Sequence, residues 1–134
     1  MYVEEKDIIR IQEIQPLVLA MIGDSVHTLF VRQHVALTYG VKVNKMSKYV
    51  SSVVSAGAQF RTFKKIEESL TDDEADVARR ARNTHIHSKS KNFSITEYIY
   101  ATALEAVIGY LYLLDETDRL NEILKISLEE MKVE

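Results

Sequence analysis

Two long apolar segments dominate the chain, and each carries one carboxylate in the middle of an otherwise apolar surface. The first runs from Pro16 to about Thr38, and the second runs from Ser94 to Leu114. Apolar residues recur at helical spacing in the first, and Pro16 suits the start of a helix because its missing N–H costs nothing there. The second segment is apolar nearly all round, as is typical of a buried central helix. The two segments therefore predict two central helices of a small α protein.

The lone acids in these segments are Asp24 and Glu105. Each has a glycine nearby, Gly23 and Gly109, which lets a neighbouring helix approach closely. If both acids point into a space shared by the two helices, their charges repel, and a hard divalent cation is the usual remedy. The alternative is that each acid lies at the rim of its apolar face or is neutralised by an arginine. Asp24 is predicted to share its face with Leu17, Met21, Val31 and Val35.

Composition places the chain among small helical proteins. It has 134 residues, 46% of them hydrophobic, which suffices for one domain with a buried core. One proline and four glycines leave little turn chemistry for a β fold. The absence of cysteine excludes disulfides and thiolate zinc sites, and the charged N-terminal residues lack the apolar core of an export signal. We therefore expect a single all-α domain over residues 1–134, in the cytoplasm and without a membrane span.

Start and stop signals divide the rest of the chain into helices. Residues 1–15 are expected to form a peripheral segment with a short helix, and Gly40 is expected to end the first long helix. Gly57 predicts a break or a kink. Thr71 and Glu74 have the spacing of a capping box at the start of a further helix. The other predicted N-caps are Asn44, Ser94 and Thr117.

A basic segment stands out in a chain whose net charge is −3. It begins at the end of a predicted helix and continues into residues 83–92, which show no periodicity and are expected to form an exposed loop. Cations, amides and hydroxyls of this kind hold phosphate backbones and contact ribose hydroxyls. The alternative is that the arginines only complement the negative end of a helix dipole. The candidate RNA-binding residues are Arg79, Arg80, Arg82, Asn83, Thr84, His85, Lys89, Lys91 and Asn92.

Three blocks of this sequence resemble those of the Mini-ribonucleases III, short bacterial relatives of ribonuclease III that lack its separate domain for binding double-stranded RNA. The first signature helix of that family is similar to LAMIGDSVHTLFVRQH, residues 19–34. Its basic segment is similar to ARRARNT, residues 78–84, followed by Lys91 and Asn92. Its second signature helix is similar to YIYATALEAVIGYLYL, residues 98–113. The resemblance covers roughly residues 16–130, with the blocks in the same order and at the same spacing.

The resemblance implies a homodimeric, all-α ribonuclease III catalytic-domain fold. It implies Mg²⁺-dependent hydrolysis of both strands of double-stranded RNA, with Mn²⁺ able to substitute, and Asp24 and Glu105 as catalytic metal ligands. It also implies a role in maturing large ribosomal RNA from its precursor, with a ribosomal protein or another ribosome-associated factor presenting the substrate. Full-length ribonucleases III carry two further acids at the positions held here by Ala20 and Thr102.

This chain departs from the Mini type at two places that bear on RNA preference. Thr28 stands where the family commonly has glutamate, and residues 85–90 differ from its usual loop of small residues.

The expected chemistry is attack of water on phosphorus in line with the departing 3′ oxygen, which leaves a 5′ phosphate. In a two-fold dimer the two sites would face opposite strands.

Other functions stay open on the residues alone. A non-catalytic RNA-binding dimer would use the acids structurally, and a helical protein-interaction module would bind no nucleic acid. A metal-dependent nucleotide phosphohydrolase is disfavoured because the sequence contains no adjacent His-Asp pair.

Overall fold

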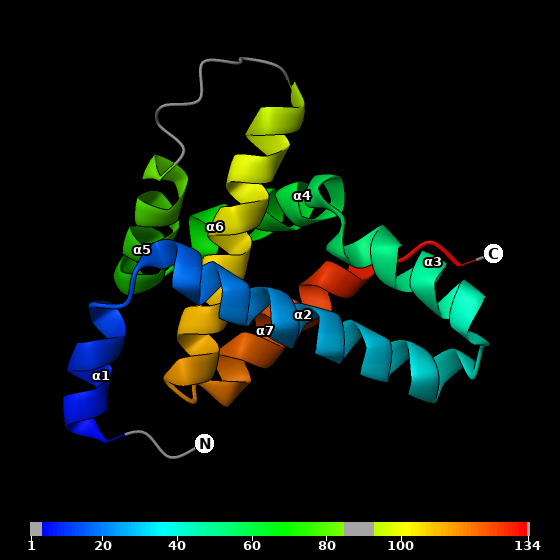
Figure 1. Ribbon diagram of the computed structural model, residues 1–134, viewed down its shortest axis with the longest axis horizontal. Coiled ribbons are helices and arrows are strands. Elements are labelled where there is room, and N and C mark those ends of the chain that lie inside the picture. Colours follow the sequence, from blue (N-terminus) through cyan, green and yellow to red (C-terminus); the bar gives the residue numbers. More distant parts are fainter. Residues whose placement is uncertain (1–3, 85–92, 134) are drawn as a thin grey trace.

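The computed structural model describes residues 4–84 and 93–133, and all regular secondary structure in these ranges is helical, which confirms the all-α prediction (Figure 1). Short connections separate the helices within each described range, and two 3₁₀ turns directly follow an α-helix. The elements are α1 (Glu5–Gln12), α2 (Pro16–Tyr39), α3 (Val43–Val54), α4 (Ala56–Ile66), η1 (Glu67–Ser69), α5 (Asp72–Asn83), α6 (Phe93–Leu113), α7 (Thr117–Ser127) and η2 (Leu128–Glu130).

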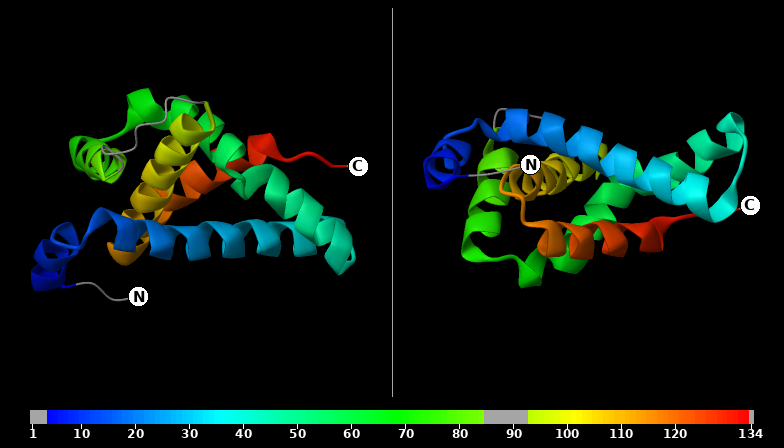
Figure 2. Two further views of the ribbon diagram at one scale, coloured as in Figure 1. Left: turned by 45° about the horizontal axis from the view of Figure 1, so that its top comes forward. Right: turned by 90° about the horizontal axis from the view of Figure 1, so that it is seen from below.

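Helix α6 is the central element, as its apolar surface predicts. It packs against α2, α4, α5 and α7, and α2 crosses it in the views of Figures 1 and 2. One hydrophobic cluster surrounds α6 and includes Leu19, Phe63 and Ile108, all fully buried. A second, smaller cluster joins the C-terminal half of α2 to α3 through Val35 and Val53. The long helix α2 therefore contributes to both clusters, one at each end.

The predicted apolar face of α2 is correct only in its second half. Val31 and Val35 are fully buried, whereas Leu17 is 44% exposed and Met21 is 72% exposed. The buried residues instead follow steps of four along the helix, and each step of four residues advances the position by about 40° around the axis. The buried stripe therefore winds round α2, so that one geometric face is open at Met21 and closed at Val35. Its members are Leu19, Ala20, Gly23, His27, Val31 and Val35.

Several predicted helix ends are confirmed. Pro16 occupies the first position of α2, and Gly40 ends that helix in the left-handed conformation, with φ 58°. Thr71 and Glu74 form the predicted capping box of α5. Residues 1–15 contain the expected short helix, but only Ile11 among its isoleucines is buried.

Other predicted ends are wrong by one or two residues. Helix α3 begins before Asn44, and the break expected at Gly57 occurs at Ser55, whose hydroxyl accepts a hydrogen bond from the Ala58 N–H. A serine N-cap competes effectively with glycine here because it satisfies a free N–H of the next helix. Glu116, not Thr117, precedes α7, without a side-chain cap. The side chain of Ser94 lies outside the described part of the structure.

Candidate active site at the crossing of α2 and α6

Two glycines set the distance between α2 and α6. A Cβ atom on Gly23 would lie 1.7 Å from the Glu105 carbonyl oxygen, and one on Gly109 would lie 2.0 Å from the Leu19 carbonyl oxygen. No side chain larger than hydrogen fits either place without moving a helix, since both obstacles are backbone atoms. The crossing therefore brings the backbones of the two helices into direct contact. It places Asp24, which follows Gly23, beside Glu105.

The side chains of Asp24 and Glu105 are in hydrogen-bonding contact. Asp24 is exposed, whereas Glu105 is half-buried between the helices. The pKa of the Glu105 carboxyl is raised to about 8, first by burial and then by the hydrogen bond and negative charge of Asp24, against a smaller lowering by Gln59. The Glu105 carboxyl therefore keeps its proton near neutral pH. The two lone acids of the sequence thus meet in space.

The acid pair opens into a surface hollow of about 430 Å³. Met21 and Tyr98, on opposite helices, are both largely exposed at its edge, so the carboxylates are accessible from solvent. Ala20 and Thr102 also line this hollow but add no carboxylate, and the Thr102 hydroxyl donates to the Tyr98 carbonyl oxygen at 2.9 Å. Within the described ranges, no group of three or more His, Cys, Asp or Glu side chains converges. The site therefore offers two protein carboxylates.

Comparison with known proteins relates the chain to ribonucleases. Residues 17–116 match the family model of the ribonuclease III domain. The chain is 42% identical to Mini-ribonuclease 3 of Clostridium tetani over 119 residues, which cover 88% of this chain and 79% of that protein. It is 39% identical to Mini-ribonuclease 3 of a Thermoanaerobacter species over 116 residues, covering 87% and 82%. A crystal structure of a Fusobacterium nucleatum protein superposes with a TM-score of 0.76, at 33% identity, over 86% of this chain and 92% of that one.

The chain belongs to the Mini-ribonuclease III family. The family model spans both acids and both glycines of the crossing. Membership makes the protein a ribonuclease of the ribonuclease III type, and it confirms the resemblance read from the three sequence blocks. None of the helices in the described ranges is both long and apolar enough to cross a membrane.

The structure describes only the first part of the predicted RNA-binding segment in this Mini-ribonuclease III. Arg79 and Arg80 both pair with Asp76, at 2.6 and 3.0 Å, and Arg82 lies 3.7 Å from Glu67. Asn83 is the last residue of α5 and not a loop residue, and the Thr84 hydroxyl donates to the Ala81 carbonyl oxygen. The remaining candidates lie outside the described residues, namely His85, Lys89, Lys91 and Asn92.

Sequence reasoning missed three buried polar residues next to the acid pair. Gln59 of α4 donates a hydrogen bond to Glu105, and Gln59 also contacts His27, which in turn contacts Ser127. All three are at most 3% exposed. The available signal was weak: each is one polar residue within a helical apolar stripe, and such a residue often lies at the edge of a buried face.

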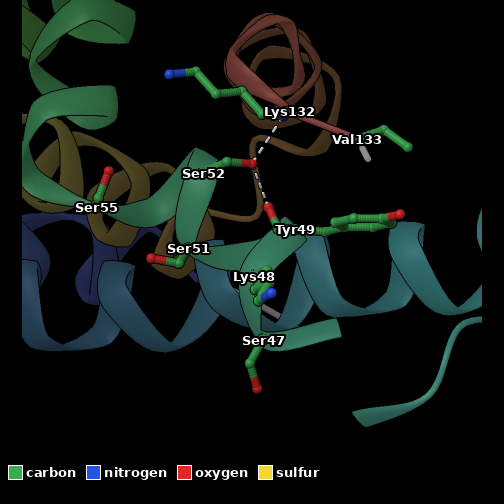
Figure 3. A pocket seen from close by; sticks show the side chains of 8 residues that line it. All are labelled: Ser47, Lys48, Tyr49, Ser51, Ser52, Ser55, Lys132 and Val133. Carbon is green, nitrogen blue, oxygen red and sulfur yellow. Dashed lines mark hydrogen bonds between the residues drawn. The ribbon is translucent and has the colours of Figure 1, made fainter. Parts of the chain in front are cut away.

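A larger surface hollow, of about 590 Å³, lies between α3 and the C-terminal residues (Figure 3). Its walls carry hydroxyl groups and two lysines. The Ser52 hydroxyl connects α3 to the C-terminal residues, because it donates to the Tyr49 carbonyl oxygen and accepts from the Lys132 backbone N–H. An adjoining hollow of about 450 Å³ reaches Thr28 and Arg32 of α2. The two hollows share Ser47, Ser51 and Ser55.

The hydroxyl-lined surface of α3, defined by Ser47, Ser51 and Ser55, meets α2 at Thr28 and Arg32. Thr28 and Arg32 follow Asp24 at intervals of four residues, so they lie about one and two turns further along the same side of the helix. Thr28, the position singled out in the sequence, therefore lines the second hollow, one turn from Asp24.

Proposed function

We propose that this Mini-ribonuclease III hydrolyses phosphodiester bonds in double-stranded RNA at the Asp24–Glu105 pair, using Mg²⁺ or Mn²⁺, in the maturation of large ribosomal RNA. The observation that carries the proposal is the meeting of two carboxylates from separate apolar helices in a solvent-open hollow. Such an arrangement is costly for the fold, since like charges repel at short distance and burial disfavours ionisation. Family membership supports the same reading.

The residues present suit a hard divalent cation. Both side chains supply carboxylate oxygens, which Mg²⁺ prefers, and Mg²⁺ is commonly held by one or two carboxylates while it keeps several waters. Binding of a cation by both carboxylates would displace the proton that Glu105 keeps near neutral pH. Asp24 and Glu105 would be the protein ligands, and the cation would supply Lewis-acid polarisation of the phosphate and activation of water.

The side chains around the pair favour water as the nucleophile. Among the residues lining this hollow, the aliphatic hydroxyl is that of Thr102, and it is engaged with the Tyr98 carbonyl oxygen. No cysteine exists in the chain, and no histidine of the described residues lines the hollow. Attack by water in line with the 3′ oxygen would leave a 5′ phosphate and a 3′ hydroxyl. The chain's own contribution is to orient the two carboxylates and to hold the RNA backbone.

Two surfaces are proposed to hold the RNA backbone. One is the basic segment, comprising Arg79, Arg80, Arg82, Asn83 and Thr84 with His85, Lys89, Lys91 and Asn92. The other is the hydroxyl-lined surface of α3, which leads from Asp24 past Thr28 and Arg32. Hydroxyl, amide and cationic groups form most contacts to phosphate and sugar in nucleic-acid complexes. An RNA duplex whose cleaved phosphate sits at Asp24 would extend along α2 over this surface.

We further propose that the protein acts as a homodimer whose contacts involve the exposed apolar residues beside the site. Leu17, Met21 and Leu29 on α2 are 44, 72 and 66% exposed, which is unusual for so many large apolar side chains on one helix. Tyr98 and Tyr112 of α6 are also more than two-fifths exposed. A two-fold contact through this region would place two acid pairs on one RNA duplex.

The proposal is tested by incubating a ribosomal-RNA-derived duplex with the protein over a Mg²⁺ titration. Product should form only when the divalent cation is present, should carry a 5′ phosphate, and should disappear on addition of EDTA. Mn²⁺ should restore activity, whereas a single-stranded RNA of the same sequence should stay intact. Binding of the duplex without product at any cation concentration would contradict the proposal and would favour a non-catalytic RNA-binding protein.

Neutralising the start of the basic segment should weaken RNA binding. We expect the double variant Arg79→Gln/Arg80→Gln to lose about tenfold in duplex affinity and to lower the slope of log K against log salt by about 2, because each lost phosphate contact removes about one released counterion. Fluorescence anisotropy across a salt series in EDTA measures both quantities.

The matched control is Arg10→Gln/Lys125→Gln, which removes the same charge from exposed positions on α1 and α7. It should leave the slope unchanged. If both double variants bind RNA equally well, the arginines of α5 only complement the negative end of the helix dipole and do not bind RNA.

A further inference from the structure

Three buried polar side chains connect α7, α2 and α4 to the acid pair. The His27 Nε2 atom lies 3.0 Å from the Ser127 Oγ atom, and the His27 Nδ1 atom lies 3.1 Å from the Gln59 Nε2 atom. Gln59 then donates a hydrogen bond to the Glu105 carboxylate. His27 and Ser127 are fully buried, and Gln59 is 3% exposed. We name this series, Ser127–His27–Gln59, the polar relay.

The direction of each hydrogen bond in the relay is fixed. The Ser127 hydroxyl donates its only hydrogen to the Leu124 carbonyl oxygen at 2.6 Å, so it accepts from His27. Burial lowers the pKa of His27 to about 4, so the ring is neutral near neutral pH and carries one N–H. That N–H is on Nε2, and Nδ1 is therefore an acceptor. It accepts one of the two amide hydrogens of Gln59, which leaves the other for Glu105.

A buried core does not need the hydrogen bonds of the polar relay, because apolar side chains would fill the same space. Three polar side chains inside a hydrophobic core are costly unless every donor and acceptor is matched, and apolar residues of the same size would pack there without that cost. The relay is matched from the Leu124 carbonyl oxygen to the carboxylate. Its effect is to present one N–H group at a fixed place beside Glu105, where a flexible glutamate could otherwise adopt several rotamers.

We infer that Gln59 is a positioning residue for the metal ligand Glu105, held in its orientation by His27 and Ser127. The inference rests on the proposed function, since it assigns to Glu105 the role of a ligand. The hydrogen bond from Gln59 holds the Glu105 carboxylate next to Asp24, at the hollow that both acids line. Partners of this kind orient the groups that bind metals directly, and their loss commonly weakens metal affinity by about 10- to 100-fold.

The inference is tested with Gln59→Met, which keeps the length of the side chain and removes its amide. Mn²⁺ alone, titrated into the metal-free protein and followed by electron paramagnetic resonance, should bind about 10- to 100-fold more weakly than to the parent. The maximal cleavage rate at saturating RNA should fall, while the KM for duplex RNA should stay within about twofold, because Gln59 is buried away from the RNA surface. The unfolding temperature should fall moderately, because the buried His27 Nδ1 atom loses its donor, but the protein should remain folded.

The matched control is Thr62→Val on the same helix. Thr62 is also fully buried, and its hydroxyl has no hydrogen-bond partner within the described structure. This variant removes a polar atom from α4 without touching the relay, so its Mn²⁺ affinity should equal that of the parent. Equal Mn²⁺ affinity in Gln59→Met and in the parent would overturn the inference.

Ser127→Ala gives a second measurement that holds even if Gln59→Met does not fold. It removes the acceptor that fixes the His27 tautomer, so Mn²⁺ affinity should fall by a smaller factor, about threefold to tenfold. Unchanged affinity would show that the relay does not orient Glu105. Failure of the proposed function has a different signature: the parent and Asp24→Asn would then bind Mn²⁺ equally weakly.

Discussion

Asp24→Asn and Glu105→Gln will each lower the rate of duplex cleavage by about a thousandfold or more while RNA binding survives. The proposed cation contributes several kcal/mol of transition-state stabilisation, and about 4 kcal/mol corresponds to a factor of a thousand in rate. Each substitution replaces one of only two carboxylates in the hollow. Single-turnover cleavage at saturating Mg²⁺ measures the rate, and anisotropy with Ca²⁺ in place of Mg²⁺ measures binding.

The fold of these variants should be intact, which separates this outcome from simple loss of structure. The raised pKa of Glu105 reflects the cost of placing a charge next to Asp24 in a half-buried position, and an amide at either place removes the repulsion. Both variants should therefore unfold at a temperature no lower than that of the parent. Asp118→Asn makes the same chemical change at an exposed position of α7 and should cleave normally. Substantial cleavage by both site variants would exclude the Asp24–Glu105 pair as the metal site.

Gly23→Ala and Gly109→Ala should be the most destabilising single-methyl changes in the protein. In each case the new Cβ atom would stand 2.0 Å or less from a carbonyl oxygen of the opposite helix. Relief requires that α2 and α6 separate, and overpacking of this kind costs about 1 to 3 kcal/mol or more. We expect the free energy of unfolding to fall by about 3 kcal/mol, which lowers the unfolding temperature by about 10 °C. Separation of the helices also moves Asp24 from Glu105, so cleavage should fall even below the unfolding temperature.

Gly57→Ala is the matched control for this prediction. Gly57 lies within α4, where alanine is favoured over glycine by about 0.5 to 1 kcal/mol. Its new Cβ atom would meet the Glu97 Oε2 atom at 2.8 Å, but that atom ends a flexible side chain that can move aside. Chemical denaturation should therefore show little change or a small gain in stability. If Gly23→Ala is as stable as Gly57→Ala, the two helices do not cross as closely as described.

Features that depend on a few adjacent residues were predictable from the sequence. The stop at Gly40 and the capping box of Thr71 with Glu74 each involve groups within one helical turn, so the sequence pattern is sufficient. Asp24 and Glu105 were predicted to meet because an isolated acid in an apolar helix is costly wherever that helix packs. Their role in binding metal stays a prediction.

Apart from the meeting of Asp24 and Glu105, the features that depend on packing between distant helices were not predictable. The buried stripe of α2 changes sides because α6 covers one half of the helix and α3 covers the other, and a periodic pattern assumes one partner throughout. Gln59 was missed for a similar reason. A lone glutamine in an amphipathic helix gives no sign of its partner. Here the partners, His27 and Glu105, lie 32 and 46 residues away in the sequence.

The arginine pairs at the end of α5 have a consequence for catalytic turnover. Because Asp76 and Glu67 already occupy these guanidinium groups, an incoming phosphate gains only the difference between two ion pairs. If the basic segment binds RNA as proposed, these arginines would add little to the affinity for the substrate. Weak binding at this end would let the cleaved duplex dissociate quickly. Selection among RNAs would then depend more on how well the shape of an RNA duplex fits the protein surface than on attraction between opposite charges.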